Sequence, residues 1–218
     1  MYSSDRLNSK KNENVGKKLY VRYMVSLRCK TIVQKELNHL KLKYSLLSFG
    51  AIQFTAAVEE KELKALKRNL RKSGLDLLGH HESILVDRVI STILEVIHSF
   101  DELPNLSYSE IIAKNISEAN DSVLKIFSEV VGMSVIQFIV AQKIERVKEL
   151  LLYDDILLPD IANHLRYKSE RHLIAQFKKI TGLTPSHFMK LKEERAKVIL
   201  QSLQEFDKKK SVKIKPAS

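Results

Sequence analysis

The chain has 218 residues, of which 44% are hydrophobic, and its 37 Lys and Arg against 26 Asp and Glu give a net charge of +11. This length predicts one or two domains, and the charge favours a polyanionic partner. With 6 Gly, 4 Pro, no Trp and a single Cys, we expect a soluble, mostly helical protein of a reducing cytoplasm, without a disulfide framework, secretion signal or membrane span.

Residues 1–16 are polar and predicted to be disordered, and a small α+β domain is predicted over residues 17–81. Alternating apolar and polar side chains predict strands over residues 19–25, 44–49, 51–56 and 75–78. Apolar residues at helical spacing predict helices over residues 29–42 and 61–72. The resulting order β-α-β-β-α-β is that of the ferredoxin-like split βαβ fold.

The loop after the first predicted strand reads MVSLRC, and RKSGLDL precedes the last strand. With these segments the front domain resembles a heavy-metal-associated domain of the copper-chaperone kind. That family has two Cys separated by two residues in this loop, whereas here Ser26 takes the first position and only Cys29 remains. Because a soft monovalent metal needs two thiolates, Cys29 is a weakened candidate metal ligand. A reactive thiol at a helix N-terminus and an inert, partly buried Cys are the alternatives.

A pattern of helix, tight turn and helix occurs in residues 158–188. Ile161, Ala162 and Leu165 form the apolar stripe of a first helix. Ser169 is placed to cap a second helix, whose predicted buried face is Leu173, Phe177 and Ile180. Gly182 predicts the end of this helix, and Thr184-Pro185 the start of the next.

The same pattern occurs earlier in the chain. Phe127 and Gly132 precede Phe177 and Gly182 by 50 residues, and Ile111 and Ile112 take the part of Ile161 and Ala162. A helix over residues 135–153, roughly 27 Å long, is predicted to join the copies and to set two recognition helices about one DNA turn apart. The alternative is a helical repeat or an all-α bundle in which the two Phe residues are only core.

Residues 84–195 resemble the DNA-binding domain of the AraC/XylS family of transcription regulators. The resemblance rests on FSEVVGMSVIQFIVAQKIERVKELL, LPDIANHL and FKKITGLTPSHF. It implies seven helices in two helix-turn-helix units that bind successive major-groove segments. Two departures are the Arg166-Tyr167 pair, where the family commonly has a glycine and an aromatic residue, and Leu173, where an aromatic is common. The fold class is therefore mostly α, an all-α double helix-turn-helix domain preceded by a small α+β ferredoxin-like domain.

The side chains expected to contact DNA lie on the two second helices. On the later one we expect base contacts from Ser169, Arg171, His172 and Gln176, and phosphate contacts from Lys168, Lys178 and Lys179. On the earlier one the candidates are Asn120, Asp121, Ser122 and Lys125. Asp121 either accepts a hydrogen bond from cytosine or repels phosphate. The alternative for all of them is a solvated helix face.

The charge is unevenly distributed along the chain. Residues 1–81 hold 17 Lys and Arg against 7 Asp and Glu, whereas residues 82–133 hold 3 against 9. An acidic first helix-turn-helix is unexpected in a protein that binds DNA strongly. Two hypotheses follow: either the basic front domain contacts the DNA backbone itself, or it docks on the acidic segment and masks it.

The sequence favours a regulator over an enzyme, because it has no glycine-rich phosphate loop, His-x-x-x-His pair or nucleophile elbow. We expect a cytoplasmic, sequence-specific transcription regulator, bacterial by its resemblance, that needs no cofactor. Its partners would be double-stranded DNA and RNA polymerase, with no particular oligomeric state predicted. The front domain (17–81) would regulate the DNA-binding domain (83–200), and residues 201–218 would form a basic flexible tail. The alternatives are a metal or thiol sensor acting through Cys29, and a protein-interaction module that binds a basic partner through residues 82–133.

Overall fold

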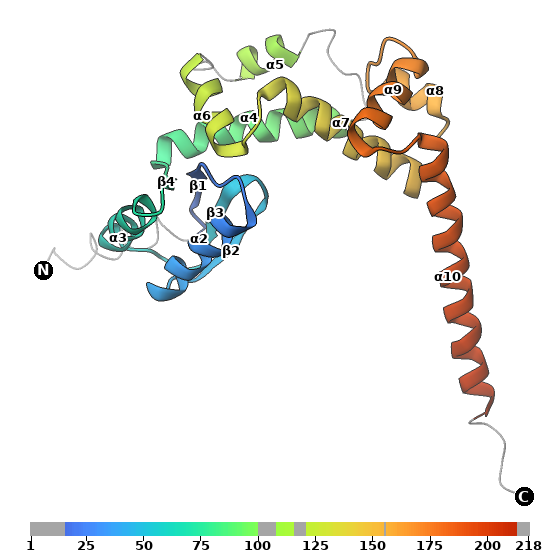
Figure 1. The fold of residues 1–218 in the computed structure, drawn as a ribbon, viewed down its shortest axis with the longest axis horizontal. Coiled ribbons are helices and arrows are strands. Elements are labelled where there is room, and N and C mark those ends of the chain that lie inside the picture. The colour runs from blue at the N-terminus through green and yellow to red at the C-terminus, as the bar shows by residue number, and fades with distance from the viewer. Residues whose placement is uncertain (1–15, 100–107, 116–120, 155, 213–218) are drawn as a thin grey trace, which may run out of the picture. The chain divides into compact units, whose positions relative to one another are not determined.

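The structure is a computed structural model that describes residues 16–99, 108–115, 121–154 and 156–212 (Figure 1). It divides into two compact units, residues 1–139 and residues 140–218. The division falls within helix α7 (Val135–Tyr153). The first unit therefore contains the α+β front domain together with the first helix-turn-helix, and the second unit contains the second helix-turn-helix.

The front domain has the element order expected from the sequence. β1 (Lys18–Arg22), α2 (Leu27–His39), β2 (Tyr44–Leu46), the 3-10 turn η1 (Ser48–Gly50), β3 (Ala51–Phe54), α3 (Glu60–Arg71) and β4 (Asp76–Leu77) follow one another. The strands lie in the order β2-β3-β1-β4, and every neighbouring pair is antiparallel. β1 is thus a central strand, and β1 and β4 are neighbours that run in opposite directions.

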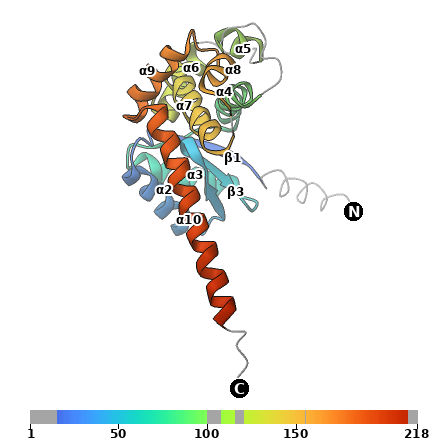
Figure 2. The same ribbon diagram turned by 90° about the vertical axis from the view of Figure 1, so that its right-hand side faces the viewer.

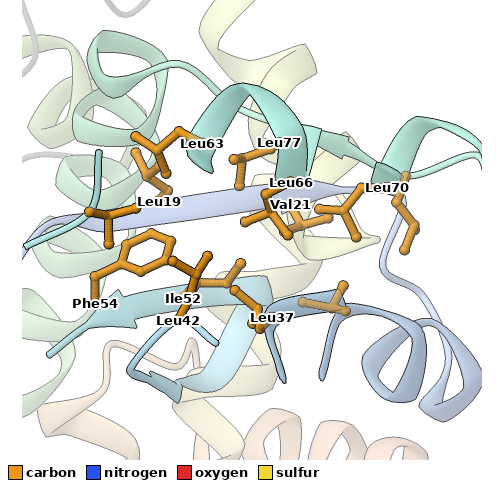
Figure 3. Packing of buried hydrophobic residues seen from close by; sticks show 13 residues of the cluster. Leu19, Val21, Leu37, Leu42, Ile52, Phe54, Leu63, Leu66, Leu70 and Leu77 are labelled. Carbon is orange, nitrogen blue, oxygen red and sulfur yellow. The ribbon is translucent and has the colours of Figure 1, made fainter. Parts of the chain in front are cut away.

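The two faces of β1 pack against different parts of the protein. Leu19 and Val21 point into a core that α2 and α3 close with leucine side chains such as Leu37, Leu66 and Leu70 (Figure 3). Burying one such leucine contributes roughly 1.5–3 kcal/mol. Successive residues of a strand alternate between its faces, so Lys18, Tyr20 and Arg22 lie on the other face.

Helix α4 (His80–His98) covers this other face of the sheet, opposite α2 and α3 (Figure 1). Lys18 pairs with Asp87, and the Tyr20 hydroxyl donates to the same carboxylate at 2.7 Å. The Tyr20 amide donates to the Ser83 hydroxyl at 3.3 Å. Burial and the neighbouring carboxylate raise the pKa of Tyr20 above its usual value. The basic strand therefore docks on the start of the acidic segment, as the second of the two charge hypotheses requires.

From residue 80 onward the described residues form seven helices, the number that the AraC/XylS resemblance implies. After α4 come α5 (Tyr108–Asn115), α6 (Asp121–Val131), α7, α8 (Leu158–His164), α9 (Glu170–Thr181) and α10 (Pro185–Val212). α7 has the bounds predicted from the sequence. Ile111 and Ile112 on α5, and Ile161 and Ala162 on α8, are all buried, as their matching places in the two copies predict.

The two helix-turn-helix copies share their packing geometry. The rings of Phe127 and Phe138 meet edge to face with centroids 5.4 Å apart, and those of Phe177 and Phe188 do so at 5.6 Å. Gly132 and Gly182 both take the left-handed conformation, with φ of 78° and 77°. Residues that are 50 positions apart in the two copies therefore correspond in structure as well as in sequence.

Two expectations are wrong. Ile180 is 48% exposed, although the helical spacing places it with the buried Leu173 and Phe177. It lies in the last turn of α9, beyond the part that is covered within its unit. In addition, α10 continues through Val212 as one long helix (Figure 2), so residues 201–212 are helical where a flexible tail was expected. Helix-favouring residues without Gly or Pro between 186 and 212 account for the extension.

None of the described helices is by itself long and apolar enough to cross a bilayer, and only α6 and α7, taken together across a 53° bend, reach that length and composition.

Candidate nucleic-acid interface

Helix α9 begins and ends with the signals predicted for it. The Ser169 hydroxyl accepts a hydrogen bond from the amide of His172 at 3.2 Å and so caps the first turn. Gly182, with φ of 77°, closes the last turn, and its amide donates to the carbonyl of Lys178 at 2.9 Å. Because these contacts fix both ends, α9 holds a defined set of side chains towards solvent.

The exposed face of α9 carries most of the predicted DNA contacts. Arg171, His172, Lys178 and Lys179 are all exposed and lie opposite the buried Leu173 and Phe177. Gln176 is half-buried at the border of this face. Lys168 and Ser169 are exposed at the N-terminal end, where the helix dipole also favours an anion. The structure thus brings all seven predicted residues of the second copy to one end and one side of a single helix.

The first copy presents a smaller face. Asp121, Ser122 and Lys125 are exposed on the N-terminal turns of α6, opposite the buried Val123 and Phe127. Asn120 lies outside the described residues. The three described candidates carry no net charge, whereas the equivalent face of α9 is basic. The second copy is therefore the stronger electrostatic partner for phosphate.

Sequence reasoning missed a second group of cations, beneath the turn between α8 and α9. The Lys143 ammonium on α7 lies 5.2 Å from the centre of the Tyr167 ring. Burial, and to a smaller extent the charge of the nearby Arg166, lower the pKa of Lys143 to about 8. Arg166 has a positive φ of 54°, which a non-glycine residue adopts only at a cost, and it stands where the AraC/XylS family commonly has glycine. The arginine in place of this glycine is the sequence signal that could have pointed to these cations.

Cys29 lies in the first turn of α2 and is half-buried. The Ser26 hydroxyl caps this helix, accepting from the Cys29 amide at 3.3 Å, and lies 3.2 Å from the Cys29 sulfur. The hydrogen bond with the Ser26 hydroxyl is the main cause that lowers the pKa of the thiol below its usual value. Among the described residues no group of three or more His, Cys, Asp or Glu side chains is arranged to hold a metal ion.

Comparison with known proteins supports the helix-turn-helix assignment. Residues 115–191, about a third of the chain, match the family model of a helix-turn-helix domain. Over 104 residues the chain is 28% identical to the uncharacterized HTH-type transcriptional regulator YtdP of Bacillus subtilis (strain 168). This alignment covers 48% of the chain and 13% of YtdP.

A solved structure gives a partial likeness. The DNA-binding domain of AdpA, described as a global transcriptional factor in complex with a target DNA, superposes with a TM-score of 0.42 at 19% identity. The superposition covers 50% of this chain and 94% of the AdpA domain. The family match begins at residue 115, so it does not reach the front domain, whose resemblance to a heavy-metal-associated domain stays a prediction.

Proposed function

We propose that this chain is a sequence-specific DNA-binding transcription regulator of AraC/XylS type, acting in the bacterial cytoplasm. In this proposal α6 and α9 enter adjacent major-groove segments of double-stranded DNA, α7 sets their spacing, and RNA polymerase is a further partner. The observation that carries the proposal is the duplicated helix-turn-helix, in which both second helices keep an exposed polar face. A solvated face alone would not account for the exposed cations Arg171, Lys178 and Lys179 along α9.

We assign roles to the side chains by their place on these helices. Arg171 and His172 face outward in the first turns of α9, where groove-reading residues usually lie. Arg171 would donate to guanine, and Lys178 and Lys179 to phosphates. Gln176, at the edge of the face, and Ser169, whose oxygen already accepts the His172 amide, would make fewer base contacts.

The proposed domains are those expected from the sequence, residues 17–81 and 83–200, with control exerted by the first on the second. No catalytic role and no cofactor are part of the proposal, because its side chains are arranged for hydrogen bonding to a polyanion. The alternative of a protein-interaction module is weakened because Glu82, Asp87 and Glu129 of the acidic segment already pair within the chain.

Selection of duplexes from a random DNA pool tests this function. We expect the purified protein to enrich a site with two half-elements about 10 base pairs apart, centre to centre. The Arg171→Ala variant should relax the sequence of one half-element and leave the other unchanged. Absence of enrichment over background would refute sequence-specific binding.

A thiol-responsive regulator is the second candidate function, since Ser26 lowers the pKa of Cys29. A thiol with a lowered pKa ionises more readily, and therefore reacts with oxidants more readily, than an ordinary thiol. Cys29→Ser tests this candidate. If DNA binding by the natural protein changes with Cu(I) or peroxide and that of the variant does not, Cys29 is the sensor, whereas identical behaviour of both rules it out.

A further inference from the structure

The acidic residues of the first helix-turn-helix are used to bind the front domain. Arg22, at the end of β1, donates through one guanidinium nitrogen to Glu82 on α4 at 2.7 Å. Its other terminal nitrogen lies 3.4 Å from Glu129 in the last turn of α6. Arg22 is only 20% exposed, and such a planar fork suits two carboxylates. One side chain of the front domain thus joins the start of α4 to the end of the first recognition helix.

A backbone contact reaches the same end of α6. The amide of Tyr23 donates to the backbone carbonyl of Glu129 at 2.8 Å, which satisfies one of the free carbonyls of the last turn. Tyr23 takes a positive φ of 65°, and the chain turns there directly after β1. The backbone of the front domain is therefore bent to meet the helix.

The η1 turn adds an aromatic contact. The ring of Phe49 meets Phe138 edge to face, with centroids 5.0 Å apart, and Phe138 in turn meets Phe127 on α6. Phe49 has a φ of 57°, a conformation that a bulky side chain adopts only under strain. The front domain therefore completes the core of the first helix-turn-helix with one of its own rings.

The second copy provides an internal control, because it has no front domain beside it in its unit. Val130 on α6 is 2% exposed, whereas Ile180, 50 residues later, is 48% exposed. Phe138 is fully buried, whereas Phe188 is only half-buried. Position 129 holds the Glu that Arg22 binds, and position 179 holds an exposed Lys. At all three pairs of positions, the residue of the first copy is more buried or is bound by the front domain, whereas its equivalent in the second copy is more exposed.

We propose that the front domain is a brace for the first recognition helix, with Arg22 and Phe49 as positioning residues that hold α6 in its DNA-binding orientation. The predicted effect on DNA binding rests on the proposed function, whereas the predicted effect on the stability of α6 does not. Arg22 and Tyr23 contact the C-terminal turn of α6, and Asp121, Ser122 and Lys125 stay exposed for DNA. Any change in the front domain that loosens Arg22 or η1 would then weaken one half of the DNA site and leave the other intact.

Hydrogen exchange of the free, full-length protein tests whether the front domain stabilises α6. Arg22→Gln and Glu129→Gln should each raise exchange of the α6 amides by roughly two- to fivefold, the effect expected of a partly exposed ion pair. The double variant should add little to either. Lys18→Gln is the matched control, because it breaks an ion pair on the same strand whose partner, Asp87, lies on α4. Phe49→Ala should act as Arg22→Gln does, and exchange within α9 should stay unchanged throughout.

DNA binding distinguishes the brace from simple electrostatics. Glu129→Gln removes a negative charge, so electrostatics alone predicts tighter binding, whereas the brace predicts roughly two- to fivefold weaker binding. The loss should appear on the selected duplex and vanish when the half-element of α6 is scrambled. Arg22→Lys should bind DNA more tightly than Arg22→Gln, since lysine keeps the positive charge, and less tightly than the natural protein, since it lacks the planar guanidinium.

The two ideas fail in different ways. If the natural protein selects no duplex, the proposed function fails, and the exchange data still decide on the brace. If α6 exchanges equally in the natural protein, Arg22→Gln and Glu129→Gln, the brace is refuted. Weaker binding of Glu129→Gln to intact and scrambled duplexes alike would also refute it, because the effect would then not be specific to α6.

Discussion

At the scale of single residues, the most direct difference between the two recognition helices lies in their first turns. Arg171 and His172 stand on α9 at the places where Asp121 and Ser122 stand on α6. All four are exposed, so the difference concerns what each helix offers to DNA. Arginine donates in a fork to guanine, whereas aspartate can only accept, and accepts best from cytosine. The two half-elements should therefore differ in sequence.

Replacing Arg171 with alanine should weaken binding to the selected duplex by about 1–3 kcal/mol, because a bidentate contact to one base would be lost. Fluorescence anisotropy titration of a labelled duplex measures this. Lys190→Ala is the control, since it removes an exposed positive charge from α10. Equal losses in the two variants would show that Arg171 contributes charge and not recognition.

Lys143 predicts a pH dependence of stability. Its pKa in the folded protein is about 8, below the usual value that it regains on unfolding, so the unfolded state binds more protons between the two values. Stability should therefore rise as the pH increases from about 8 to about 10.5. Urea unfolding of the natural protein should show this rise, and Lys143→Met should lack this contribution. Lys168→Met removes an exposed lysine nearby and should follow the natural protein, and parallel curves for all three proteins would contradict the assignment.

At the scale of elements, periodicity and capping residues predicted the helices well. Val135 and Tyr153 bound α7 as expected, because its apolar residues recur at helical spacing throughout. Ser169 and Gly182 fixed the ends of α9 for reasons local to the chain. The prediction that Ile180 is buried was wrong, because burial depends on what covers a helix. Its equivalent Val130 is buried by a neighbour that no local pattern reveals.

The Ser169 cap can be measured separately from DNA binding. Ser169→Ala should cost the first turn of α9 about 1 kcal/mol, because the His172 amide would lose its acceptor. Hydrogen exchange resolved to residues 170–173 should therefore be about fivefold faster in the variant. Ser186→Ala, at an exposed position on α10, should leave that segment unchanged. Unaltered exchange in Ser169→Ala would mean that the cap does not stabilise the helix.

At the scale of the whole molecule, charge and composition predicted a polyanion partner but not how the charges are used within the chain. The net charges of residues 1–81 and 82–133 are opposite, and Lys18 and Arg22 show where they meet. The choice between docking and direct DNA contact required the structure, because Glu82 and Glu129 are 47 residues apart in the chain and both pair with Arg22. The acidic charge of the first helix-turn-helix is thereby reconciled with the proposed DNA-binding function.

In the proposed function, the two helix-turn-helix units of one chain occupy successive major-groove segments. Hydroxyl-radical footprinting of the full-length protein on the selected duplex tests it most directly. We predict two protected segments on one face of the DNA, about 10 base pairs apart, with the α9 segment persisting in Arg22→Gln while the α6 segment weakens. A single protected segment, or two that lie on opposite faces, would contradict the account.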